Sequence, residues 1–94
     1  MKIAMIEDDT TISFAVKTFL KRYDIEISIF NTLNEAEEMN IKEFDLMILD
    51  VNLPDGSGFD FLKWIRGFSE IPVIMLTVKS SDELCITRFF TRSR

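Results

Sequence analysis

Residues 45–58 read Asp45-Leu46-Met47-Ile48-Leu49-Asp50-Val51-Asn52-Leu53-Pro54-Asp55-Gly56-Ser57-Gly58. Four consecutive apolar residues precede Asp50. A strand that is apolar on both faces is typical of the centre of a parallel sheet covered by helices. The residues from Asn52 to Gly58 are rich in turn-forming types. This stretch therefore predicts a buried strand that ends at Asp50 and is followed by a tight loop.

The flanking sequence alternates between expected strands and expected helices. Further strands are predicted at Lys2–Ile6, Glu26–Phe30 and Pro72–Leu76. Apolar residues at helical spacing predict helices between these strands, carried by Ile12, Ala15, Val16, Phe19, Leu20 and Tyr23, by Leu33, Ala36 and Met39, and by Phe59, Leu62 and Ile65. The order predicts one α/β domain, a doubly wound parallel sheet with helices on both faces.

Polar residues that can cap helices stand at the starts of these helical segments. Asp9 or Thr10 would cap the first helix, and Asn31 or Thr32 would cap the second. Ser80 or Ser81 could cap a fourth helix that runs through Leu84.

Composition narrows the class of protein. The 94 residues carry a formal net charge of −5, no His and one Cys. No basic stripe is present, so we expect no nucleic-acid contact from this segment. A catalytic or metal-binding imidazole is excluded within these residues, and a single Cys suits a reducing cytosol. No apolar run is long enough to span a membrane and no signal peptide is evident, so a cytoplasmic location is expected.

Polar side chains follow three of the expected strands. Glu7 and Asp8 follow the first strand, Asp50 and then Asn52 follow the third, and Thr77 follows the fourth. In open parallel α/β sheets, functional residues gather beyond the carboxyl ends of the strands. If the first and third strands are neighbours, three carboxylates converge and repel one another. Oxygen ligands of this kind suit Mg²⁺, and a carboxylate beside the metal could act as a nucleophile toward phosphorus.

Three pieces of the sequence together resemble the receiver domain of bacterial two-component response regulators. They are Ile6-Glu7-Asp8-Asp9, Leu49-Asp50-Val51-Asn52-Leu53-Pro54-Asp55-Gly56-Ser57-Gly58 and Pro72-Val73-Ile74-Met75-Leu76-Thr77. The resemblance covers residues 1–87 and implies a flavodoxin-like fold with strand order 2-1-3-4.

The resemblance also implies a role for each strand-end residue. Asp50 would be the phospho-acceptor, which takes a phosphoryl group from a histidine of a sensor kinase. Glu7 and Asp8 would form an acidic pocket, in which Asp8, Asp50 and the backbone carbonyl of Asn52 hold Mg²⁺. Thr77 would be the switch hydroxyl. Such a domain is a signalling module rather than an enzyme, and it controls an output domain, here most similar to those of transcription regulators.

The end of the chain departs from the receiver pattern. A complete receiver continues into a fifth strand that ends in a Lys, and into a fifth helix, and both are expected to be absent here. Residues 88–94 form a basic tail with Arg88, Arg92 and Arg94 after an acidic chain. A frameshift near Arg88 would account for it, because suitable codons read one base later give Asp-Phe-Ser-Leu-Gly-Ala. An exposed fourth strand and an uncovered face would then favour self-association.

Other interpretations remain open for the same residues. Glu7 and Asp8 could be acids favoured by the dipole at a helix start, and for Asp9 a capping role is the better interpretation. Without its Lys, the chain could be a phosphorylation-deficient remnant that acts by self-association or partner binding. A phosphohydrolase with an aspartate nucleophile would need an acid-base residue where Asn52 stands. A flavin-binding module is disfavoured because the acids after the first strand would repel its phosphate.

Overall fold

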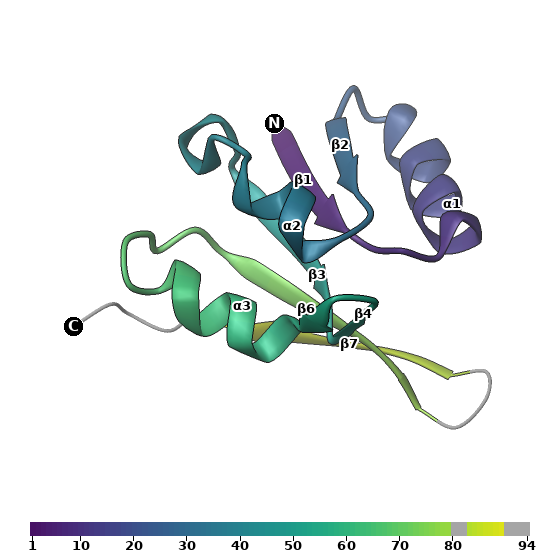
Figure 1. Ribbon diagram of the computed structural model, residues 1–94. Helices are drawn as coiled ribbons and strands as arrows, with labels where there is room; N and C mark the ends of the chain where they lie inside the picture. The colour runs from purple at the N-terminus through teal and green to yellow at the C-terminus, as the bar shows by residue number, and fades with distance from the viewer. Residues whose placement is uncertain (80–82, 90–94) are drawn as a thin grey trace.

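The structure, a computed structural model, describes residues 1–79 and 83–89 (Figure 1). In chain order the elements are β1 (Lys2–Ile6), α1 (Thr10–Lys21), β2 (Glu26–Phe30), α2 (Leu33–Glu37), a 3₁₀ turn (Ile41–Glu43), β3 (Leu46–Asp50), β4 (Asn52–Leu53), β5 (Gly56–Ser57), α3 (Gly58–Ile65), β6 (Val73–Lys79) and β7 (Glu83–Phe89). The predicted strands and the first three predicted helices are confirmed.

The main sheet has the strand order β2-β1-β3-β6-β7. The first four of these strands run parallel, which confirms the order predicted for the four expected strands. β3 lies in the middle, between β1 and β6. The α/β prediction for this chain is therefore correct, and the carboxyl ends of β1, β3 and β6 lie at the same edge.

Both faces of the sheet carry apolar side chains, and the two faces are covered differently. On one face Met47 and Leu49 of β3 belong to a cluster that α2 and α3 help to close. On the other face Ile48 packs in a cluster with Val16 and Leu20 of α1. In Figure 1, α1 stands apart from α2 and α3. The unbroken apolar run before Asp50 is thus explained, because successive residues of β3 face different helices.

Each helix begins where a short polar side chain can accept hydrogen bonds from its first turn. The Asp9 carboxylate accepts from the backbone N–H groups of Thr11 and Ile12 at the start of α1. Thr32 and Ser57 do the same for α2 and α3. Of the proposed caps, Asp9 and Thr32 are the ones that the structure confirms.

The prediction of a fourth helix that runs through Leu84 is wrong. Glu83 and Leu84 lie in β7, which pairs antiparallel with β6 from Val73 opposite Phe89 to Lys79 opposite Glu83. The expected caps, Ser80 and Ser81, lie outside the described residues. An antiparallel strand can follow a very short connection, whereas a parallel one needs a long crossover. β7 also covers the edge of β6 that was expected to be exposed, so that expectation is wrong as well.

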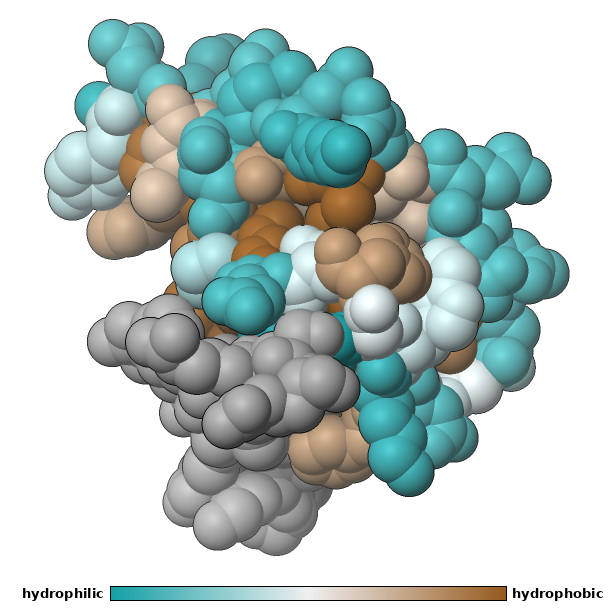
Figure 2. Space-filling model, turned by 90° about the vertical axis from the view of Figure 1, so that its left-hand side faces the viewer, coloured by the Kyte–Doolittle hydropathy of each residue, from teal (hydrophilic) through white to brown (hydrophobic). Residues whose placement is uncertain are grey.

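Several large apolar side chains remain at the surface. Figure 2 shows one face on which hydrophobic residues gather in the middle, with hydrophilic residues around them. The exposed large hydrophobic residues are Met1, Phe14, Phe19, Tyr23, Phe59, Trp64 and Phe68. Among the described residues, none of the helices has the length and apolar character that crossing a bilayer requires.

Candidate functional site

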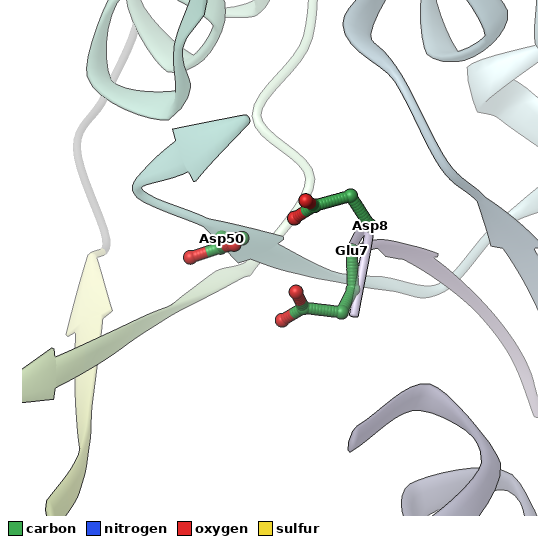
Figure 3. A group of neighbouring side chains, drawn as sticks. All are labelled: Glu7, Asp8 and Asp50. Carbon is green, nitrogen blue, oxygen red and sulfur yellow. The ribbon is translucent and has the colours of Figure 1, made fainter. Parts of the chain in front are cut away.

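The pairing of β1 with β3 brings three carboxylates together. Ile6 lies opposite Leu49 in the parallel register, so Glu7 and Asp50 come next, side by side. Asp8 follows Glu7, and one carboxylate oxygen from each of the three residues lies within 4.8 Å of the others. Figure 3 shows these side chains at the ends of the two neighbouring strands. The predicted convergence of Glu7, Asp8 and Asp50 is therefore confirmed as geometry.

Burial makes this cluster electrostatically strained. The Glu7 side chain is only 3% exposed, while Asp50 is partly buried and Asp8 is exposed. Burial raises the pKa of Glu7 from 4.5 to about 7, although the N–H of Asp9 donates to its carboxylate, and the charge of Asp50 adds to the rise. Burial also raises the pKa of Asp50. Each carboxyl group also affects the pKa of the other, and because the pKa of Glu7 is raised to about 7, Glu7 is partly protonated near neutral pH.

A bound cation could take the place of that proton. The three side chains offer only oxygen ligands, which hard cations such as Mg²⁺ prefer. Mg²⁺ also keeps several waters, so a site with few protein ligands and one exposed side suits it. Because Asp8 is exposed and Asp50 is only partly buried, such waters have room. The residues present therefore fit a magnesium ion.

The loop after Asp50 folds back onto it. The N–H of Gly58 donates to the carbonyl of Val51 at 2.6 Å, and β4 and β5 pair between these residues. A Cβ at Gly58 would overlap the backbone carbonyl oxygen of Asp50 and would lie 3.1 Å from the Cα of Val51. Only glycine allows this approach, so Gly58 belongs to the support of the site. The sequence identifies Gly58 as a turn-forming residue, but it does not reveal that Gly58 packs against the backbone of Asp50.

Asp55 ties the same loop to α2. Its carboxylate accepts hydrogen bonds from the backbone N–H groups of Leu33 and Asn34, each at 2.9 Å. These bonds hold the pKa of Asp55 below its usual range. Asp55 thus acts as a second N-terminal cap of α2 from twenty-two residues away in sequence. No local pattern predicts a cap from that distance.

The structure describes less of the surroundings of the other two predicted site residues, Asn52 and Thr77. The N–H of Asn52 donates to Oδ1 of Asp50 at 3.4 Å, so Asn52 adjoins the acidic cluster. Thr77 lies in β6, where its backbone is opposite Cys85, and the place of its hydroxyl is outside what the structure describes. The roles of Asn52 as a metal ligand and Thr77 as a switch remain predictions.

This chain is similar to several proteins of known sequence or structure. The response regulator receiver domain family matches residues 3–89. Among curated relatives, the regulatory protein VanRc of Enterococcus gallinarum is 39% identical over 82 residues, which are 86% of this chain and 36% of VanRc. The transcriptional regulatory protein SpaR of Bacillus subtilis is 28% identical over 90 residues, 96% of this chain and 41% of SpaR. This chain thus spans about two fifths of these relatives' length.

Solved structures agree with the sequence relatives. The BeF₃-activated N-terminal receiver domain of Klebsiella pneumoniae RstA has a TM-score of 0.79 and 29% identity, over 87% of this chain and 71% of that one. The non-phosphorylated HemR receiver domain of Leptospira biflexa has a TM-score of 0.75 and 30% identity, over 86% and 67%. The sheet, the acidic cluster and the loop after β3 are together typical of a regulatory receiver domain. The chain belongs to the response regulator receiver domain family.

Replacing Gly58 with Ala should damage the site through the backbone. We expect a loss of about 1–3 kcal/mol in unfolding free energy and weaker Mg²⁺ binding, because the new Cβ must displace the Asp50 carbonyl. Urea unfolding and calorimetric Mg²⁺ titration measure the two effects. Gly67→Ala is the matched control, because its Cβ would meet only the Trp64 carbonyl oxygen at 3.2 Å. Equal effects of the two substitutions would contradict this account of Gly58.

Replacing Glu7 with Gln should stabilise the metal-free protein at alkaline pH. Because the pKa of Glu7 is about 7 when folded against 4.5 ordinarily, the folded state holds a proton that the unfolded state releases between these values. Stability of the wild-type protein is therefore lost as pH rises through about 7. Near pH ~8 with a chelator, we expect the Gln variant to be more stable by about 1–2 kcal/mol.

The advantage of the Gln variant should shrink near pH ~5, where Glu7 is largely protonated when folded. Urea unfolding at the two pH values measures it, and the exposed Glu43→Gln is the control for general charge effects. A Gln variant that is less stable than wild type at alkaline pH would show that the buried charge is not costly.

Proposed function

We propose that this chain is a phospho-acceptor module in which the carboxylate of Asp50 takes a phosphoryl group from a histidine of a sensor kinase. The observation that carries the proposal is the position of Asp50, partly buried at the end of the central strand β3 and beside Glu7 and Asp8. A carboxylate in this position can act as a nucleophile toward phosphorus. Membership in the receiver family supports the same assignment.

The transfer conserves atoms and charge in a simple way. An oxygen of Asp50 forms a bond to phosphorus while the phosphorus–nitrogen bond to the kinase imidazole breaks. The electron pair of that bond leaves with the imidazole, which takes a proton, and Asp50 becomes an acyl phosphate. The partly buried carboxylate of Asp50 must be ionised to attack, and the strongly raised pKa of Glu7 favours the proton on Glu7 rather than on Asp50.

Mg²⁺ would support this step by neutralising the carboxylates and the incoming phosphoryl group. We assign Asp8, Asp50 and the carbonyl of Asn52 as its protein ligands, with Glu7 completing the acidic pocket. Thr77 would donate its hydroxyl to a phosphoryl oxygen and so sense the modification. These roles follow the receiver pattern, and the clustering of Glu7, Asp8 and Asp50 supports them.

We also propose which process this domain regulates. The relatives named above are regulatory proteins more than twice as long as the matched segment, and SpaR is a transcriptional regulator. We infer that this chain corresponds to the regulated part of such a protein and that its output is transcription control in the cytoplasm. An acidic segment of this kind would influence DNA binding indirectly and would not contact DNA itself.

Incubation with Mg²⁺ and acetyl phosphate tests the assignment of Asp50. We expect mass spectrometry to show the gain of one phosphoryl group that is lost in base, absent with a chelator and absent in Asp50→Asn. Asp45→Asn is the matched control, because Asp45 is an exposed acid beyond the other end of β3. It should be labelled like wild type.

The same experiment separates the alternatives. Mg²⁺ binding without labelling would favour the phosphorylation-deficient alternative, for which the absence of Lys from residues 83–89 is the supporting observation. Continuous release of phosphate would indicate a phosphohydrolase. Labelling that persists in Asp50→Asn would contradict the proposal.

We also propose self-association through the face of the sheet beside α1. Apolar residues line a groove of about 320 Å³ there, namely Ala15, Val16, Phe19, Leu20, Ile48, Ile74 and Leu76. Phe19 is 53% exposed at its edge. A second copy of the chain would cover this apolar surface.

Replacing Phe19 with Asp should therefore shift the chain toward monomer. The charge would enter the groove, and burying it against a second copy is costly. Phe14→Asp is the matched control, because Phe14 is 70% exposed on the same helix but does not line the groove. Sedimentation velocity measures the outcome. A wild-type chain that remains a monodisperse monomer at micromolar concentration would contradict the proposal.

A further inference from the structure

A second groove lies on the opposite face of the sheet, between α2 and α3. It consists of two hollows, of about 80 Å³ and 240 Å³, that share Glu37, Phe61 and Trp64 as walls. The smaller hollow is otherwise apolar, with Met39, Ile41 and Phe68 among its lining residues. The larger one adds acidic residues, Asp55 and Asp60. Aromatic and acidic side chains thus line one continuous surface, which we call the α2–α3 groove.

The aromatic side chains of this groove form a row along α3. The ring centroids of Phe61 and Trp64 lie 5.5 Å apart, and those of Trp64 and Phe68 lie 5.0 Å apart, edge to face. Trp64 is 50% exposed and Phe68 is 55% exposed, so large parts of both rings face solvent. These contacts hold the rings against one another and leave apolar surface open to a ligand.

The acids of the groove are not all explained by the fold. Asp55 caps α2, and Asp60 lies in the first turn of α3, where the helix dipole favours negative charge. Glu37 is different, because it ends α2, where the dipole disfavours a carboxylate. Within the described residues, the side-chain carboxylates of Glu37 and Asp60 have no hydrogen-bond or ion-pair partner. Two unpaired carboxylates therefore line the same hollow as the half-exposed Trp64.

We propose that the α2–α3 groove binds an arginine-bearing peptide segment of a partner protein. A guanidinium group can stack on the exposed face of an aromatic ring and donate to carboxylates through its edges. The groove offers both features together, because Glu37, Asp60 and Trp64 line the same hollow. Lysine has no planar group to stack, so it fits less well. This surface is separate from the acidic cluster around Asp50, so the proposal stands independently of phosphoryl transfer.

The single tryptophan of the chain makes the groove directly observable, because Trp64 alone reports in tryptophan fluorescence. The probe is a short acetylated and amidated peptide with two arginines among alanines. We expect a saturable change in Trp64 emission, an affinity at least about threefold lower for the lysine counterpart, and no saturable change with the glutamate counterpart. Equal responses to all three peptides would overturn the proposal.

Removing the charges of Glu37 and Asp60 together tests whether the acidic residues of the groove contribute to peptide binding. The double variant Glu37→Gln with Asp60→Asn should bind the arginine peptide on the order of fivefold more weakly. The control removes two charges elsewhere, with Asp24→Asn and Glu26→Gln, which adjoin the amino end of β2. This control should bind like wild type and so excludes a general effect of net charge. Equal weakening in both double variants would overturn the proposal.

Two further measurements show whether a loss of peptide binding reflects the groove or a damaged fold. Thermal unfolding checks that each variant is folded, and Mg²⁺ affinity should be unchanged in the Glu37 and Asp60 variant. If that variant does not fold, amide chemical shifts of the wild-type protein decide instead. On addition of the arginine peptide, we expect shifts at 33–41 and 55–68, and shifts confined to other regions would overturn the proposal.

Discussion

The parallel pairing of β1 with β3 places the carboxyl groups of Glu7 and Asp50 side by side where burial disfavours charge. Glu7 directly follows β1 and Asp50 is the last residue of β3. Neither residue can move away, because the side chains of these strands fill the core on both faces. The pair must hold a proton or a cation. The chemistry of the pair therefore depends on the pairing of strands in the sheet. The buried acid lowers the stability of the metal-free protein.

The surroundings of the pair are built to keep it in place. Gly58 lets the loop after β3 return to the Asp50 backbone, and Asp55 anchors that loop to the start of α2. β6 pairs with β3 on the other side, so Asp50 is held from three directions. A change at Asp50 can thus reach β6 through backbone pairing and α2 through the Asp55 carboxylate. The family's role as a regulatory module is consistent with such a connected site.

Local patterns were sufficient to predict most of this arrangement. The apolar run before Asp50 indicated a central strand, and acids at two strand ends indicated the cluster, because parallel strands end at one edge. The segment at 83–89 was predicted in part as a helix from possible caps at Ser80 and Ser81, but it pairs with β6 as a strand. The pairing of a strand with a sheet edge joins residues that are far apart in sequence. Here this pairing outweighs the weak local preference for a helix. For the same reason the contacts of Asp55 and Gly58 were not foreseen.

The central claim is that Glu7 and Asp50 share a proton that a cation must displace. Calorimetric Mg²⁺ titrations near neutral pH, in buffers of different ionisation enthalpy, count the protons released on binding. Because the pKa of Glu7 is about 7, the account predicts a release of up to about half a proton per ion at pH ~7, falling toward zero near pH ~9. Mg²⁺ binding with no proton release near neutral pH would contradict it.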